Sequence, residues 1–168
     1  MTTLPPTPLT NALLLDTHNV VWLDSGNERL LPPTRALIDA CWQRGGSLYV
    51  SAVSAWEIAQ LVERGRITLH LPVRRWIEGL TDRFGTETIS LTYEAATRAY
   101  ALPDWFHRDP GDRLLIATAI ELHVPLVTYD ERIAAFARNC RNAIGFGNAK
   151  LVGHLPRDVP FMMAALVI

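Results

Sequence analysis

Short strand-forming runs, most of them apolar, alternate with longer amphipathic stretches along most of this chain. Ala12 to Leu15, Ser47 to Val50, Glu87 to Leu91 and Pro125 to Thr128 have the length and composition of strands. Between them, apolar residues recur at the three- and four-residue spacing of helices that bury one face. This alternation predicts an α/β fold of three layers, in which helices flank a mainly parallel central sheet.

The amphipathic stretches locate the predicted helices. These helices follow Asp16, Ser51 and Asp112, or span Pro33 to Arg44, Pro72 to Phe84, Thr92 to Leu102 and Asp130 to Arg138. The helix after Asp112 is expected to bury Leu115, Ile116, Ala119 and Leu122. The helix after Ser51 is expected to bury Val53, Trp56, Ile58, Leu61 and Val62. The helices therefore have enough apolar surface to cover both faces of a sheet.

At 168 residues, 49% of them hydrophobic, the chain has the size and composition of one globular domain. We predict a flexible leader over residues 1–11, a folded domain over 12–138, and a C-terminal segment over 139–168 that holds a last strand, a tail or both. The terminal run FMMAALVI is too short to span a bilayer, so no membrane partner is expected.

The cysteines bear on the cellular compartment of the protein, and the charged residues bear on its possible ligands. The cysteines, Cys41 and Cys140, lack CxxC spacing and fall in helical patterns, so we expect free thiols in the cytoplasm. The formal net charge of −1 argues neither for nor against nucleic acid. Arginines are concentrated in one part of the sequence: Arg64, Arg66, Arg74, Arg75 and Arg83. They predict either contacts with phosphate groups or a solvated helix surface balanced by acids.

Four acids lie near junctions between a predicted strand and the next helix: Asp16, Glu57, Asp112 and Asp130. Any one of them could be a helix cap or a surface acid. However, the carboxyl ends of parallel strands meet at one edge of a sheet, where α/β proteins bind ligands. Carboxylates gathered there repel one another unless a cation or proton neutralises them. Oxygen ligands favour Mg²⁺ or Mn²⁺, and we expect the histidines at the surface or beside the site: His18, His107 and His123.

Four short motifs, LLLDTHNVVW, SAWEIAQL, DPGDRLLIATA and LVTYDERI, occur in this order between Leu13 and Arg138. Together they resemble the PIN-domain ribonucleases, and most closely the VapC toxins of bacterial toxin–antitoxin pairs. The resemblance implies a PIN-like fold and metal-dependent cleavage of RNA, with Mg²⁺ or Mn²⁺ held by the four acids. It also implies that Thr128 lies beside the site, with Asp109 as a capping or supporting residue and His18 nearby. Gly111 departs from the family pattern, where a bulky residue is common, and is expected to loosen the loop before Asp112.

The resemblance further implies two partners, a small antitoxin and a second copy of the chain. Trp56 and Trp76 are candidate anchors for them, although both could belong to the core, and for Trp56 the core is the favoured interpretation. Trp105 and Phe106 lie in a loop flanked by prolines, which is usually at the surface. We therefore predict that a partner covers Trp105 and Phe106.

Two other function classes are compatible with an α/β fold. One is a non-catalytic RNA-binding or scaffold protein, against which the presence of all four acids argues. The other is a different phosphoryl-transfer protein. A haloacid-dehalogenase-like phosphatase requires a second Asp two residues after its nucleophile, where this chain has His18, and a receiver domain requires a late lysine, for which only Lys150 is available.

Overall fold

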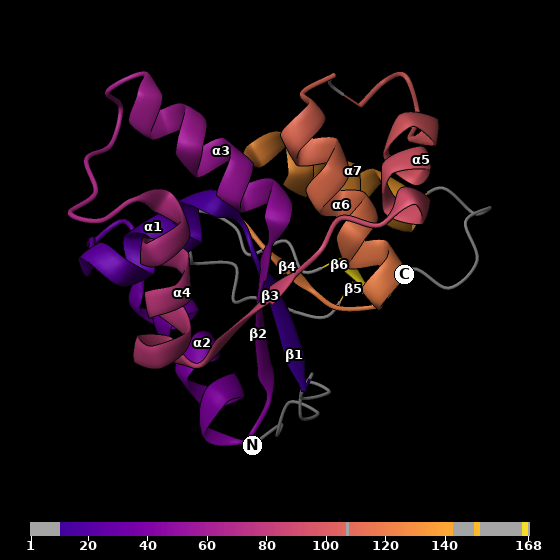
Figure 1. Cartoon of the computed structure of the whole chain (residues 1–168). Helices are drawn as coiled ribbons and strands as arrows, with labels where there is room; N and C mark the ends of the chain where they lie inside the picture. The colour runs from indigo at the N-terminus through magenta and orange to yellow at the C-terminus, as the bar shows by residue number, and fades with distance from the viewer. Residues whose placement is uncertain (1–10, 107, 143–149, 152–165, 168) are drawn as a thin grey trace, which may run out of the picture.

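The computed structural model describes residues 11–106, 108–142, 150–151 and 166–167 (Figure 1). Its strands are β1 (Ala12–Leu15), β2 (Ser47–Ser51), β3 (Thr86–Ile89), β4 (Leu126–Val127), β5 (Lys150–Leu151) and β6 (Leu166–Val167). Its helices are α1 (Thr17–Ser25), α2 (Pro32–Gln43), α3 (Ala52–Glu63), α4 (Val73–Phe84), α5 (Tyr93–Ala101), α6 (Pro110–Leu122) and α7 (Glu131–Asn142). Each predicted strand and helix is present within a few residues of its expected bounds.

The central sheet has the order β3-β2-β1-β4, and every pairing in it is parallel. β1 lies inside the sheet, with Leu14 opposite Tyr49 of β2 on one side and Leu126 of β4 on the other. Helices form the crossovers that parallel strands require. The predicted α/β fold is confirmed, and the carboxyl ends of all four strands lie at one edge.

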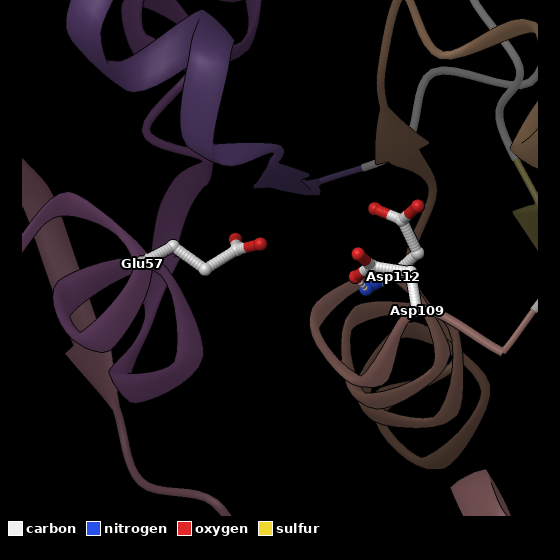
Figure 2. Close-up of side chains that lie close together, drawn as sticks. All are labelled: Glu57, Asp109 and Asp112. Carbon is white, nitrogen blue, oxygen red and sulfur yellow. Dashed lines mark hydrogen bonds between the residues drawn. The ribbon is translucent and has the colours of Figure 1, made fainter. Parts of the chain in front are cut away.

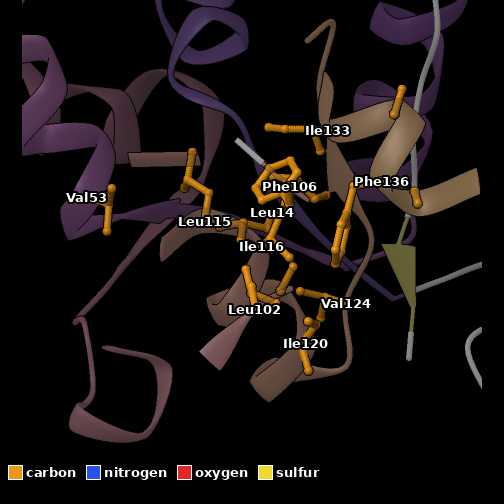
Figure 3. Close-up of a cluster of buried hydrophobic side chains, with 14 residues drawn as sticks. Leu14, Val53, Leu102, Phe106, Leu115, Ile116, Ile120, Val124, Ile133 and Phe136 are labelled. Atoms are coloured by element: carbon orange, nitrogen blue, oxygen red, sulfur yellow. The ribbon is translucent and has the colours of Figure 1, made fainter. Parts of the chain in front are cut away.

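The two faces of the sheet are covered by different sets of helices (Figure 1). Leu14 packs in one buried cluster with residues of α6 and α7 and with Phe106 (Figure 3). Its neighbours Leu13 and Leu15 face the other way, into a cluster formed with residues of α1, α2 and α4. This alternation along β1 produces the three layers. α3 contributes to both cores at the edge of the sheet.

Three predictions about burial are wrong. Trp56 is 53% exposed, because it lies nearly opposite Ile58 on α3, and Ile58 faces the core. Leu122 is 39% exposed, because α6 ends there and His123 adopts a left-handed conformation immediately after it. Phe106 is 3% exposed although it lies in a loop, because its ring packs against Phe136 at a centroid distance of 4.8 Å.

The chain ends lie largely outside the described residues. The leader is described only at Asn11, and the described residues of the C-terminal segment after α7 form an antiparallel pair, β5 with β6, separate from the four-stranded sheet. Cys41 is a buried free thiol, as predicted, whereas the side chain of Cys140 lies outside the described part of the chain. Among the described residues, no helix combines the length and apolarity needed to cross a bilayer.

Candidate metal centre

Five acids near the place where the carboxyl ends of β1 and β4 meet α3 and α6 are linked because four of them act by their charge on the fifth, Asp112, and we call them the carboxylate cluster: Asp16, Glu57, Asp109, Asp112 and Asp130. Carboxylate oxygens of Glu57, Asp109 and Asp112 lie within 4.8 Å of one another. Figure 2 shows Glu57 extending from α3 toward the two aspartates at the start of α6. Residues more than fifty positions apart in the sequence thus share one site.

Asp16 directly follows β1 and is 4% exposed. The backbone N–H of Asp16 donates to the carbonyl of Val127 over 3.0 Å, which fixes its position against the end of β4. The Thr128 hydroxyl donates to its Oδ2 over 2.5 Å. Burial raises the pKa of Asp16, although the Thr128 hydrogen bond opposes that shift. A carboxylate held in this way is available as a ligand to a cation.

Glu57 lies in the second turn of α3 and is held by hydroxyl groups. Thr17 donates to its Oε2, and the Ser54 hydroxyl lies 2.9 Å from the Thr17 hydroxyl. Burial raises the pKa of Glu57, and the charges of Asp16 and Asp109 raise it further. The sequence prediction missed Thr17 and Ser54, although Thr17 directly follows Asp16 and Ser54 lies three residues before Glu57 on the same face of the helix.

Asp112 and Asp109 lie at the start of α6. Asp109 is the N-cap, because its side chain accepts a hydrogen bond from the backbone N–H of Asp112 over 3.2 Å. Burial raises the pKa of Asp112 to about 8, with the charges of Asp130, Asp109, Asp16 and Glu57 adding to the shift. All four other acids of the cluster therefore disfavour the charged form of Asp112, in addition to the effect of burial.

Gly111 allows Glu57 to approach α6. A Cβ atom at Gly111 would lie 2.2 Å from Oε1 of Glu57 and 3.3 Å from Oδ1 of Asp109. Gly111 is buried in the first turn of α6 and does not belong to the preceding loop. The expectation that this glycine loosens a loop is wrong, because its missing side chain leaves room for a carboxylate.

Asp130 is held at the start of α7. Its Oδ1 accepts hydrogen bonds from the backbone N–H groups of Arg132 and Ile133, over 2.7 and 3.1 Å. Its own N–H donates to the Thr128 hydroxyl over 3.0 Å. Because the charge of Asp130 raises the pKa of both Asp112 and Asp16, it belongs to the same electrostatic site.

The other predicted site residues are one histidine next to the cluster in sequence and four arginines on or after α3 and α4: His18, Arg64, Arg66, Arg74 and Arg75. The charge of His18, which is exposed in the first turn of α1, opposes the upward pKa shifts of Asp16 and Glu57. Arg74 and Arg75 are exposed near the start of α4, and both contact Glu78, at 2.9 and 3.8 Å, as an acid-balanced helix surface would. RNA contacts by Arg64 and Arg66, at the end of α3 and just after it, stay a prediction. His107 lies outside the described residues.

The chemistry of the donor set fits a hard divalent cation. All five members of the carboxylate cluster offer oxygen, and three of them have raised pKa values because they are buried and, in each case, lie beside other acids. Mg²⁺ and Mn²⁺ prefer carboxylate oxygen together with water and phosphate. A cation here would neutralise the repulsion that otherwise favours protonation.

The chain is similar to a known protein family, to a characterised protein and to a solved structure. The family model described as PIN domain matches residues 13–139. Ribonuclease VapC22 of Mycobacterium tuberculosis is 38% identical over 121 residues, which cover 72% of this chain and 88% of that protein. A solved structure described as a toxin–antitoxin complex from Klebsiella pneumoniae is 21% identical, covers 73% of this chain and 90% of the matched chain, and has a TM-score of 0.49. The four sequence motifs all lie within residues 13–139.

Proposed function

Because the chain belongs to the PIN-domain family, and is similar to a VapC ribonuclease over most of its length, we propose that it is a metal-dependent endoribonuclease. It hydrolyses RNA phosphodiester bonds at the carboxylate cluster, with Mg²⁺ or Mn²⁺ as cofactor. Asp16, Glu57, Asp112 and Asp130 are the proposed ligands. In the cell it acts in the cytoplasm as the toxin of a toxin–antitoxin pair.

The observation that carries this proposal is that carboxylate oxygens of Glu57, Asp109 and Asp112 lie within 4.8 Å of one another, where burial and neighbouring charges raise the pKa of Asp112 to about 8. Acids distributed over a solvated surface do not repel one another strongly, because water screens them. Here the fold forces several carboxylates into one partly buried place, which costs stability in the metal-free protein. Such a cost is typical of a functional site rather than of a structural one.

Each residue around the cluster has a definite task in this proposal. Thr128 orients the carboxylate of Asp16, and Thr17 orients that of Glu57. A bound divalent cation supplies positive charge and Lewis acidity, which activate water and stabilise the leaving oxygen of a phosphodiester. Asp130 is anchored through the start of α7, so its carboxylate keeps its place relative to Asp16. The carboxylates are therefore positioned before any substrate arrives.

Partners of the proposed toxin are a small antitoxin and a second copy of the chain. Two exposed tryptophans are candidate anchors, Trp56 on α3 at 53% exposure and Trp105 before α6 at 58%. Trp76 is buried, and its indole N–H donates to Oδ2 of Asp24 over 2.7 Å, so it is a core residue. Exposed tryptophans are frequent anchors of protein interfaces, which supports this part of the proposal.

Substitution of Asp16 with asparagine tests the proposed activity. Asp16→Asn keeps the shape of the side chain but removes a proposed metal ligand, so Mn²⁺-dependent RNA cleavage should fall by at least about 100-fold. The matched control is Asp82→Asn, because Asp82 is exposed on α4, and its cleavage rate should equal that of the wild type. A small phosphomonoester should not be hydrolysed by any of the three proteins. Wild-type cleavage by Asp16→Asn would refute the site, and hydrolysis of the phosphomonoester alone would favour a phosphatase.

A further inference from the structure

Three aromatic rings form a strip that begins at the carboxylate cluster, and we call it the aromatic strip: His18, Trp22 and Tyr129. The centroids of His18 and Trp22 are 5.7 Å apart with the rings tilted by 48°. Trp22 and Tyr129 meet edge to face, with centroids 5.4 Å apart and an interplanar angle of 66°. The strip joins α1 to the segment between β4 and α7.

The residues at both ends of the strip are close in sequence to members of the carboxylate cluster. His18 is two residues after Asp16, and its charge acts on the pKa values of Asp16 and Glu57. Tyr129 lies between Thr128 and Asp130 in the sequence. The two ends of the strip are therefore close neighbours in the chain of Asp16 and Asp130, which are proposed metal ligands.

The strip is also held rigidly on its inner side. The Tyr129 hydroxyl accepts a hydrogen bond from the backbone N–H of Leu31 over 3.0 Å and lies 2.6 Å from the Thr34 hydroxyl. Trp22 and Tyr129 pack as partly buried residues against the core that α1, α2 and α4 form with the sheet. Fixed rings lose little conformational freedom when a ligand stacks on them.

Core packing does not account for the outer part of the strip. His18 is exposed, and Trp22 on α1 is only partly buried. Trp22 thus keeps aromatic surface accessible next to a site proposed to cut phosphodiesters. Aromatic side chains in this position serve in many proteins as platforms for unpaired bases.

We propose that the aromatic strip is a nucleobase subsite, in which one base next to the scissile phosphate stacks on Trp22 and contacts His18. This inference rests on the proposed ribonuclease function and adds a binding determinant to it. Stacking tolerates every base, because each has a π-face, and it requires that the base be unpaired. The strip therefore positions the RNA through a base, while the carboxylate cluster acts on the phosphate.

A double-mutant cycle between protein and RNA tests the subsite. The RNA is a short single-stranded oligonucleotide that the wild type cleaves, in which each base flanking the cut is replaced in turn by an abasic residue. Trp22→Leu should lower kcat/KM by roughly 5- to 150-fold, the range expected for one stacked base. One abasic position should produce a similar loss, and combining the two changes should add nothing further.

Two variants separate stacking from a loss of folding. Trp22→Phe keeps an aromatic ring and should recover most of the activity. Trp42→Leu removes a tryptophan that is 56% exposed on α2 and lies outside the strip, and it should respond to every abasic RNA as the wild type does. If the losses from Trp22→Leu and from each abasic position multiply, the subsite is overturned while the ribonuclease function survives. If the wild type cleaves no RNA at all, the proposed function fails, and the subsite fails with it.

Discussion

The fold changes the acidity of one residue, Asp112, by burying it among other acids. Its carboxyl is partly buried among four other acids, and its pKa is raised to about 8. In an unfolded chain an aspartate titrates near its ordinary value of about 3.9. Between those two values the folded protein holds a proton that the unfolded chain has released. The free energy of unfolding of the metal-free protein therefore falls as the pH rises through this window.

This linkage gives the first residue-scale prediction. Asp112→Asn removes the titrating group, so the metal-free variant should be more stable than the wild type at pH 8. Its free energy of unfolding should also depend less on pH between about 5 and 8. Urea unfolding of both proteins in EDTA across this range measures how steeply the free energy of unfolding changes with pH in each. Equal slopes would show that Asp112 titrates normally and that the acids do not repel one another as argued.

Gly111 gives a second prediction at the same scale. Alanine favours a helix over glycine by about 1 kcal/mol, so Gly111→Ala should not destabilise α6. However, its methyl group would meet the carboxylate of Glu57, which is the flexible end of a side chain and can move away. We expect weaker Mn²⁺ binding and slower RNA cleavage at unchanged or slightly higher stability.

A matched control exists for that substitution. For a Cβ atom at Gly79, inside α4, the nearest atoms would be those of the guanidinium group of Arg83, which is also flexible. Gly79→Ala should therefore leave Mn²⁺ binding and cleavage unchanged. Isothermal titration with Mn²⁺ compares the two variants, and equal affinities would mean that Gly111 has no part in placing Glu57.

At the scale of elements, the sequence predicted most of the architecture because local signals were strong. Ser51 and Thr92 cap α3 and α5 through their side chains, as expected of such residues before a helical pattern. The prediction that the acids lie near one another relied on one rule, which is that parallel strands end at a common edge of the sheet. Features that depend on tertiary contacts were missed, including the exposure of Trp56 and the place of Gly111 beneath Glu57.

In the loop between α5 and α6, the prediction of exposure is right for one residue and wrong for the next. Its proline-flanked sequence predicted surface exposure for Trp105 and Phe106, yet only Trp105 is exposed, at 58%. Phe106 reaches the core because Phe136 of α7 lies close enough to receive its ring. A contact between segments thirty residues apart leaves no local signal in the sequence.

Trp105 provides the element-scale prediction about partners. If the antitoxin or a second copy covers it, hydrogen exchange across residues 103–111 should slow when the partner is added. Trp105→Ser should weaken the association by roughly 30-fold, as expected for a buried tryptophan anchor, and leave Mn²⁺ binding intact. Trp42→Ser, at a similarly exposed tryptophan on α2, is the control. Unchanged exchange in the presence of partner would exclude this surface.

At the scale of the whole molecule, the fold concentrates negative charge that its own stability does not require. The two cores on the faces of the sheet are apolar, while the carboxylate cluster lies at the edge between α3 and α6. Removing one of several repelling carboxylates stabilises such a protein, and adding a bound cation does the same. We propose that these acids form one divalent-metal site.

Thermal unfolding with increasing Mn²⁺ tests for this metal site without requiring that the RNA substrate be known. The melting temperature of the wild type should rise by several degrees and saturate, since a cation that binds only the folded state stabilises it by mass action. Asp16→Asn should melt at or above the wild-type temperature without metal and gain little from Mn²⁺, whereas Asp82→Asn should respond as the wild type does. A Mn²⁺-induced rise in Asp16→Asn equal to that of the wild type, or no rise in the wild type, would contradict the claim.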